Sequence, residues 1–281
     1  MKKTKTVSTR ELEKLAVSVR QTVLDVAYEA HVGHIASALS IVDILVVLYH
    51  RVLRIFPDAP TNPRRDRFIL SKGHAALALY ATLASRGFIP KSVLSGYCKD
   101  GGVLGTHPEY ALRHGIELST GSLGHGLSVG VGMALGLRRL ATKKDAPPRV
   151  FVLVSDSELD EGSTWEAIMF AFHHKLDNLV AIVDDNGLQA FGRTRDVLNI
   201  QPIAQKWRAF GWNVRIVEGN NVRHLSRILS DIPASPGRPS VVVAKTLGGS
   251  GVPFMQDSFA WHYWPMNESQ YKEAMMAMKK K

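Results

Sequence analysis

The 281-residue sequence predicts an α/β fold: a single doubly wound domain with a mainly parallel sheet and helices on both faces. In the second half of the chain, short apolar runs typical of buried strands alternate with stretches of helical length. Residues 150–192 hold two such runs joined by a helical stretch, the pattern of a right-handed crossover between parallel strands. Neither an internal repeat nor an interdomain linker is visible, so residues 1–281 are expected to form one domain with a basic tail at 1–8.

The first half of the chain is expected to be mainly helical. Ser8 and Glu11 have the spacing of a capping box, and apolar residues then recur at helical spacing as far as Val26. The further elements expected before residue 121 are a helix at 40–53, a proline-rich loop at 57–63, a strand at 67–70, a helix at 73–86 closed by Gly87, and a long loop at 95–120. Loops of that length in a compact domain are usually functional.

A glycine-rich turn at 121–126 opens the next predicted helix, which runs to residue 140. Glycines there can present backbone amides to an anion, or can let the helix pack closely against a neighbour, and the sequence leaves both open. After the break at Pro147 and Pro148, the expected strands lie near 150–154, 179–183, 212–217 and 240–245, and the expected helices near 162–175, 199–210 and 222–230.

Polar residues follow two of these predicted strands. Asp156 follows the strand at 150–154, and Asn186 follows the strand at 179–183. The carboxyl ends of parallel strands open on one edge of a sheet, where α/β folds bind ligands. Carboxylate, amide and carbonyl oxygens suit Mg²⁺ or Ca²⁺ that also holds a phosphate group. The alternative is that both are turn or cap residues, and that the nearby acids Glu158 and Asp160 belong to a solvated helix start.

The composition disfavours several function classes. The longest apolar stretch, residues 35–49, is too short for a membrane span and contains Asp43, and the basic start lacks the apolar core of a signal peptide. The net charge is +10, but the basic residues are scattered, which favours anionic small molecules or an acidic partner subunit over nucleic acid. The single cysteine, Cys98, rules out an internal disulfide framework and fits a cytoplasmic protein.

Several short sequence motifs, in a fixed order, resemble those of transketolases. They are SKGHAALALY at 71–80, GTHPE at 105–109, STGSLGHGLSVGVGMALG at 119–136, SELDEGSTWEA at 157–167, and an acidic turn followed some thirty residues later by asparagine. The match extends from about Thr9 to His262. The chain resembles the amino-terminal half of a transketolase, which some organisms encode as a separate subunit. The resemblance implies the thiamine-diphosphate-binding fold, with a domain of the type that binds the diphosphate.

The resemblance also implies a set of cofactor ligands. Asp156, Asn186 and the backbone carbonyl of Leu188 would bind Mg²⁺, with Ca²⁺ able to substitute, and the cation would grip the diphosphate of thiamine diphosphate. The remaining residues that the resemblance places at the cofactor are His74 and Ser157 on the diphosphate side, Gly121 and Leu123 near the pyrimidine ring, and His262 near the thiazolium ring.

Catalytic roles are implied in the same way for three histidines and a glutamate. His34 and His262 would lie near the reacting carbon and the sugar hydroxyls, and His107 near the hydroxyls of the donor. An imidazole titrates near neutrality, so it can exchange protons with a hydroxyl during C–C cleavage. Glu161, together with Glu166, would reach a dimer interface and link the cofactor site to a partner domain.

The chain departs from the family pattern at several places, one of which is Gly187, where many relatives carry lysine. Ser155 and Ser157 replace the glycines that usually flank the aspartate, and serine would be strained there if the backbone were left-handed. Ile35 replaces a proline after His34, and the loop at 245–251 lacks the usual lysines. These departures are expected to alter cofactor affinity and the reception of an anionic sugar.

The activity implied is transfer of a two-carbon ketol unit from a ketose to an aldose, with phosphorylated or specialised sugars. The glutamate that activates the cofactor belongs to a pyrimidine-binding domain, and only 36 residues follow Lys245. The chain is therefore expected to act with a separate pyrimidine-binding subunit, as a heterotetramer. Two alternatives remain. One is the α subunit of a thiamine enzyme acting on a 2-oxo acid, which the words GTHPE and SKGHA disfavour; the other is a non-catalytic regulatory homologue, which the Ser-Asp-Ser turn favours.

Overall fold

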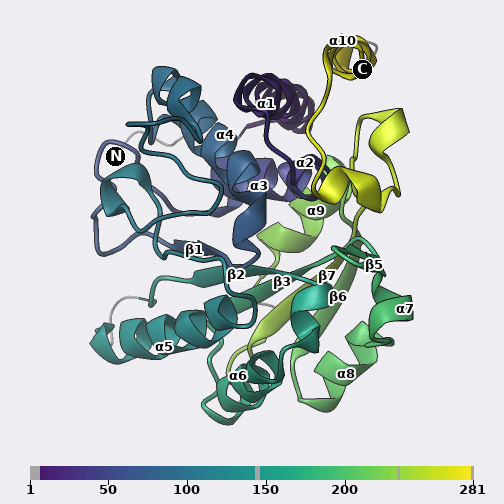
Figure 1. The fold of residues 1–281 in the computed structure, drawn as a ribbon. Helices are drawn as coiled ribbons and strands as arrows, with labels where there is room; N and C mark the ends of the chain where they lie inside the picture. Colours follow the sequence, from purple (N-terminus) through teal and green to yellow (C-terminus); the bar gives the residue numbers. More distant parts are fainter. Residues whose placement is uncertain (1–6, 143–145, 233–234, 280–281) are drawn as a thin grey trace.

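Five parallel strands form the central sheet of the computed structural model, which describes residues 7–142, 146–232 and 235–279. The strands are β1 (Arg67–Leu70), β2 (Val150–Ser155), β3 (Leu179–Asp185), β6 (Asn213–Glu218) and β7 (Ser240–Lys245). Their order across the sheet is β1-β2-β3-β7-β6, with every neighbouring pair parallel. The predicted parallel sheet is confirmed, and the strand order places β2 and β3 side by side (Figure 1).

Helices cover both faces of this sheet, as predicted (Figure 1). One face carries α1 (Thr9–Ala30), α2 (Ile35–Ser40), α3 (Val42–Val47), a π-helical turn (Leu48–Val52), α4 (Ala76–Arg86) and α9 (Val222–Ser230). The other face carries α5 (His125–Leu140), α6 (Gly162–His173) and α8 (Ile203–Ala209). The outer helix α10 (Glu268–Lys279) packs against α1, and the short α7 (Thr194–Val197) follows a small hairpin, β4 (Leu188–Gln189) and β5 (Gly192–Arg193).

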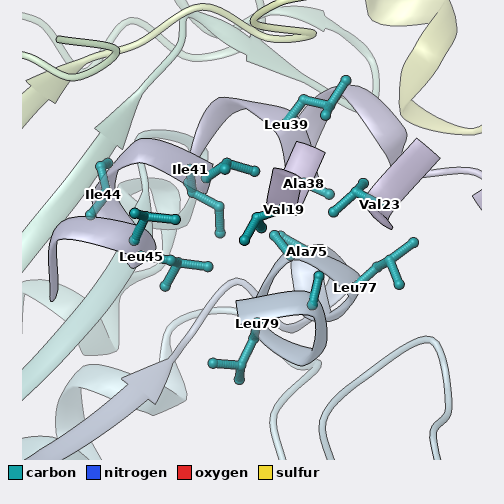
Figure 2. Close-up of a cluster of buried hydrophobic side chains, with 14 of the residues drawn as sticks. Val19, Val23, Ala38, Leu39, Ile41, Ile44, Leu45, Ala75, Leu77 and Leu79 are labelled. Atoms are coloured by element: carbon teal, nitrogen blue, oxygen red, sulfur yellow. The ribbon is translucent and has the colours of Figure 1, made fainter. Parts of the chain in front are cut away.

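Strands β2, β3 and β7 supply alternating side chains to two separate apolar cores. Phe151, Leu153 and Ile182 point to the core beneath α1–α4 and α9, whereas Val152 and Val183 point to the core beneath α5, α6 and α8. Because both faces are covered, these strands consist almost entirely of apolar residues. The labelled side chains of Figure 2 all belong to the first core. They come from α1 (Val19, Val23), from α2 to α3 (Ala38, Leu39, Ile41, Ile44, Leu45), and from Ala75 and the first turns of α4 (Leu77, Leu79).

The first helix begins as predicted. Ser8 is its N-cap, and the reciprocal hydrogen bonds with Glu11 that define a capping box are both present. Residues 1–6 of the expected basic tail lie outside the described residues. None of the helices within the described residues combines the length and the apolar character needed to cross a membrane.

Some predicted boundaries are wrong. The helix expected at 40–53 begins at Ile35 and is divided at Ile41, because an unbroken apolar run conceals where the helical period changes. The helix expected from residue 121 begins at His125, after a left-handed Gly124 with φ 84°. The helix expected at 199–210 is shorter, at Ile203–Ala209. The loop at 95–120 is confirmed as mainly irregular, with a 3₁₀ turn at Leu112–His114 inside it.

Two glycines of α5 show why this helix lies so close to the sheet. A Cβ atom added to Gly130 would lie 2.4 Å from Val152 Cγ2, and one added to Gly126 would lie 2.2 Å from Ser71 Oγ. Gly132, in the same helix, faces open space. Of the two explanations for the glycine-rich segment, close packing therefore applies to Gly126 and Gly130.

Substitution of these helical glycines should give opposite effects on stability. Gly130→Ala is expected to destabilise the protein by about 1–3 kcal/mol, because the new methyl group overlaps a buried valine on a central strand. The matched control, Gly132→Ala, should stabilise it by up to about 1 kcal/mol through helix propensity alone. Urea unfolding of both variants measures the difference; equal effects would contradict the close packing of α5.

Candidate active site

Asp156 and Asn186 lie at the adjoining carboxyl ends of β2 and β3. Ser155 is paired in register with Asp184, so the residues that follow these strands meet. One carboxylate oxygen of Asp156 accepts hydrogen bonds from the Gly187 amide and from the Thr194 hydroxyl, both at 2.9 Å. The structure therefore brings the carboxyl ends of these two strands together at one edge of the sheet, as predicted.

A cavity opens beside these two strand ends. Its lining comes from the start of α2, from segments after β1, β2 and β3, and from the long segment after β7. The lining residues are Ala36, Ser37, Lys72, His74, Ser155, Ser157, Asn186, Leu188, Gly248, Ser258, Phe259 and His262. This lining includes five of the residues predicted from the sequence: His74, Ser157, Asn186, Leu188 and His262.

Four predicted histidines form a cluster, and two of them, His74 and His262, line this cavity. The ring centroid of His34 lies 5.3 Å from that of His74, 6.5 Å from that of His107 and 5.0 Å from that of His262. His74 and His262 are 5.3 Å apart, and Tyr263 packs edge-on against both His34 and His262. Residues from four separate parts of the chain thus converge on one small volume.

The backbone around His34 is held in a conformation that few residues adopt. His34 has φ 59°, in the left-handed region, and its amide donates to the carbonyl of His262 at 2.8 Å. A Cβ atom on Gly33 would lie 2.2 Å from the carbonyl oxygen of Tyr263, so only glycine allows this approach. Ile35, which replaces the family's proline, begins α2 directly after this turn.

The environment keeps the imidazoles of His34, His74 and His262 neutral at pH 7. Burial, followed by the charges of His107 and Lys72, lowers the pKa of His34. Burial and the charge of Lys72 hold the pKa of His74 well below its usual range, and burial with the charge of His34 lowers the pKa of His262 to about 4. A neutral imidazole can accept a proton at one nitrogen and donate one at the other.

The oxygens at the strand ends fit a divalent cation. Asp156 is 1% exposed, and none of the ion pairs within the described residues includes it. Burial, and secondarily the charge of Asp184, raises the pKa of Asp156 to about 7, as expected for a carboxylate without a cation beside it. Within the described ranges, no three His, Cys, Asp or Glu side chains are grouped for metal binding, so amide and backbone oxygens would have to contribute.

The serines flanking Asp156 are not strained. Neither Ser155 nor Ser157 has a positive φ, so the left-handed backbone that would strain a serine is not present here. The two hydroxyls lie 3.0 Å apart, and the Ser155 hydroxyl accepts a hydrogen bond from the Glu158 amide at 3.1 Å. The turn therefore uses the serine side chains for its own hydrogen bonds.

Glu158 is also not part of a solvated helix start. It is 0% exposed and accepts hydrogen bonds from the Ser71 hydroxyl, from the Gly124 amide at 2.9 Å and from the Ser155 amide at 3.3 Å. The second role considered for the glycine-rich turn, presenting an amide to an anion, thus applies at Gly124, where the anion is a protein carboxylate. Asp160 is partly buried and accepts a weak hydrogen bond from Gln189 at 3.4 Å.

Like Asp156, His34 and His107, the remaining predicted site residues are not among those that line the cavity. Glu161 is exposed at the start of α6 and lies against Gly124, and Glu166 is exposed one turn further along. Gly121 packs against the His107 ring, with its Cβ position 3.2 Å from His107 Cδ2. Leu123 is half-buried in the same turn.

The sequence patterns did not identify two buried charged residues at the site. Lys72 and Asp184 are both 0% exposed and form an ion pair at 2.6 Å directly beside the cavity. Lys72 stands within the SKGH word and Asp184 two residues before Asn186, so proximity to these motifs was the available signal.

This fold, with its cavity at the carboxyl edge of the sheet, defines a doubly wound α/β domain of the ligand-binding class. The family described as transketolase, thiamine diphosphate binding domain, matches residues 12–280. An apulose-4-phosphate transketolase subunit from Phocaeicola vulgatus is 40% identical over 94% of this chain and 92% of that protein. The 6-deoxy-6-sulfo-D-fructose transketolase subunit SqwG from Clostridium sp. is 36% identical over 96% and 97%, respectively.

Solved structures agree with these sequence comparisons. The transketolase from Campylobacter jejuni superposes with a TM-score of 0.88 at 28% identity, over 95% of this chain and 42% of that chain. The chain thus spans about two fifths of the length of that solved transketolase. The chain belongs to the transketolase family, and corresponds to its amino-terminal, thiamine-diphosphate-binding portion.

Acidification from about pH 6.5 to 4 should lower the free energy of unfolding, because the buried histidines resist protonation in the folded protein. The unfolded chain binds protons on these imidazoles near pH 6.5, whereas folded His262 does so only near pH 4. Its contribution to stability is therefore fully present above about pH 6.5 and is lost as the pH falls towards 4. His262→Asn should weaken the pH dependence of the free energy of unfolding in this window.

Urea unfolding at a series of pH values measures this dependence. His173→Asn, which removes an exposed imidazole on α6, is the matched control and should leave the dependence unchanged. An identical pH dependence in His262→Asn and the wild type would contradict the assigned environment of His262.

Proposed function

We propose that this chain is the diphosphate-binding subunit of a transketolase that uses thiamine diphosphate and Mg²⁺. The observation that carries the proposal is the cavity that joins the oxygens at the ends of β2 and β3 to the histidine cluster. When bound, thiamine diphosphate supplies the carbon that bonds to the ketose carbonyl and accepts the electron pair left by C–C cleavage. Asp156, Asn186 and the Leu188 carbonyl would hold the cation, and His74 and Ser157 would contact the diphosphate.

The histidines of this chain would move protons at the sugar hydroxyls. His34 Nδ1 is buried and has no hydrogen-bond partner among the described residues, so it can accept a proton from a hydroxyl when the other nitrogen carries the hydrogen. His262 is held neutral by burial and lies 5.0 Å from His34, ring to ring. His107 lies on the loop that was predicted from the sequence to be functional, 6.5 Å from His34, ring to ring, and would contact the hydroxyls of the ketose donor.

We also propose that a second subunit completes the active site. The relatives from Phocaeicola vulgatus and Clostridium are both named as subunits, and this chain covers more than nine tenths of each. The partner would carry the pyrimidine-binding domain, and two copies of each chain would form a heterotetramer. Glu161, just before α6, and Glu166 on α6 are exposed and would face such a partner, as would the exposed Met169 and Phe170 of the same helix.

The proposed substrate is a ketose that carries an anionic group. The names of the two relatives specify a sugar phosphate and a sulfonated sugar, respectively. The net charge of +10 favours the approach of such molecules. A ketose fits the histidine cluster better than a 2-oxo acid does, because several neutral imidazoles suit a substrate with several hydroxyl groups.

Activity should require the second subunit. The purified chain, supplied with Mg²⁺, thiamine diphosphate, a ketose phosphate and an aldose phosphate, is expected to transfer no ketol unit. Addition of the pyrimidine-binding subunit should restore transfer, followed by chromatography of the sugar phosphates. Full turnover by the chain alone would overturn the two-subunit proposal, and turnover of pyruvate instead of a ketose would favour the 2-oxo-acid alternative.

Cofactor binding should depend on Asp156. Asp156→Ala is expected to weaken Mg²⁺-dependent binding of thiamine diphosphate by more than about 100-fold, because it removes a direct metal ligand rather than a supporting residue. Asp231→Asn, at an exposed position after α9, is the control and should bind like the wild type. Calorimetry with the partner present measures both; absence of any heat in the wild type would favour the regulatory alternative.

A further inference from the structure

Asp184 collects hydrogen bonds from four elements that surround the cavity. Its Oδ2 atom accepts from Lys72 Nζ at 2.6 Å, from Asn186 Nδ2 at 2.8 Å and from the Ser40 hydroxyl at 2.9 Å. Its Oδ1 atom accepts from the Thr246 hydroxyl. The donors come from α2, from the segments after β1 and β3, and from the end of β7. A carboxylate at the end of β3 therefore connects three strand ends to a helix.

The amide of Asn186 is oriented at both of its ends. Its Nδ2 donates to Asp184, and its Oδ1 accepts from the Leu188 amide at 2.9 Å. A rotated amide would place an oxygen against the Asp184 carboxylate and an NH₂ group against a backbone N–H, and neither pair can form a hydrogen bond. One lone pair of Oδ1 remains available, and Asn186 lines the cavity.

We propose that Asp184 is a positioning residue that, paired with Lys72, holds the Asn186 amide with its oxygen towards the cation site. This inference rests on the proposed function, in which Asn186 is a metal ligand. A cation requires the amide oxygen and is repelled by the amide NH₂ group, so the orientation of this amide decides whether the site can form. Residues that orient metal ligands in this way typically change metal affinity by about 10–100-fold when they are removed.

Lys72 is the cationic partner of Asp184 in a buried ion pair. Both side chains are 0% exposed, and an isolated buried carboxylate would be strongly disfavoured. Lys72 also donates to the backbone carbonyl of Ser37 at 3.2 Å, which ties the ion pair to α2. Removal of either charge alone leaves the other unpaired and endangers folding, so the test must remove both together.

Two double variants separate the hydrogen bond to Asn186 from the ion pair. Lys72→Met/Asp184→Asn removes both charges but retains an oxygen that accepts from Asn186 Nδ2, since the new NH₂ group can face the Thr246 hydroxyl. Lys72→Met/Asp184→Leu removes both charges and the acceptor with a side chain of similar shape. The two variants therefore differ in whether the Asn186 amide retains its partner.

The first measurement needs no cofactor. In ¹H–¹⁵N spectra of the chain without ligands, the Asn186 side-chain amide should exchange slowly with solvent in the wild type and in the Asn double variant, and rapidly in the Leu double variant. The second measurement is Mg²⁺-dependent binding of thiamine diphosphate by calorimetry with the partner present. The Leu double variant should bind about 10–100-fold more weakly than the Asn double variant.

The outcomes distinguish this inference from the proposed function. Equal amide exchange or equal affinity in two folded double variants, as judged by thermal melting, would overturn the role of Asp184. Absence of binding in the wild type would overturn the proposed function and with it the role of Asp184 at a cation site, while the exchange data would still report whether Asp184 orients the amide.

Discussion

The parallel register of β2 and β3 is the constraint on which the rest of the structure depends. Pairing of Ser155 with Asp184 brings the residues after both strands to one edge of the sheet, so that Asp156 and Asn186 adjoin. A slip of one residue would reverse which core each side chain enters, and the two apolar cores on opposite faces oppose any such slip. The register of β2 and β3 therefore determines both how the sheet packs into its two cores and how the site residues meet.

Several charged side chains are buried at this edge of the sheet. Asp156, Glu158 and the Lys72–Asp184 pair are all buried within a few residues of the cavity. All three carboxylates accept hydrogen bonds, but among the described residues only Asp184 of the three forms an ion pair. Burial, with a smaller contribution from the charge of Lys72, lowers the pKa values of His34, His74 and His262, which keeps proton-accepting imidazoles beside the proposed cofactor position. Lys72 thus contributes both to the ion pair with Asp184 and to the lowered pKa values of these three histidines.

Much of the fold could be predicted from the sequence, because the strands are short apolar runs between clear turn residues. The bounds of β1, β7 and α9 were predicted correctly. α10 was missed because its inward face is narrow, with Ala274 and Met278 buried, and the hairpin of β4 and β5 was missed because its strands have two residues each. The histidine cluster was predictable from motifs, whereas the Lys72–Asp184 pair joins residues 112 positions apart, a contact that no local pattern shows.

The proposed function depends on a cation that bridges Asp156, Asn186 and the Leu188 carbonyl to a diphosphate. Anomalous diffraction from crystals of the two-subunit complex, grown with Mn²⁺ in place of Mg²⁺ and with thiamine diphosphate, tests this bridge most directly. We expect a single strong peak about 2 Å from an oxygen of each of these three residues and from the diphosphate. Ordered water alone between Asp156 and Asn186, with the cofactor bound elsewhere or not at all, would contradict it.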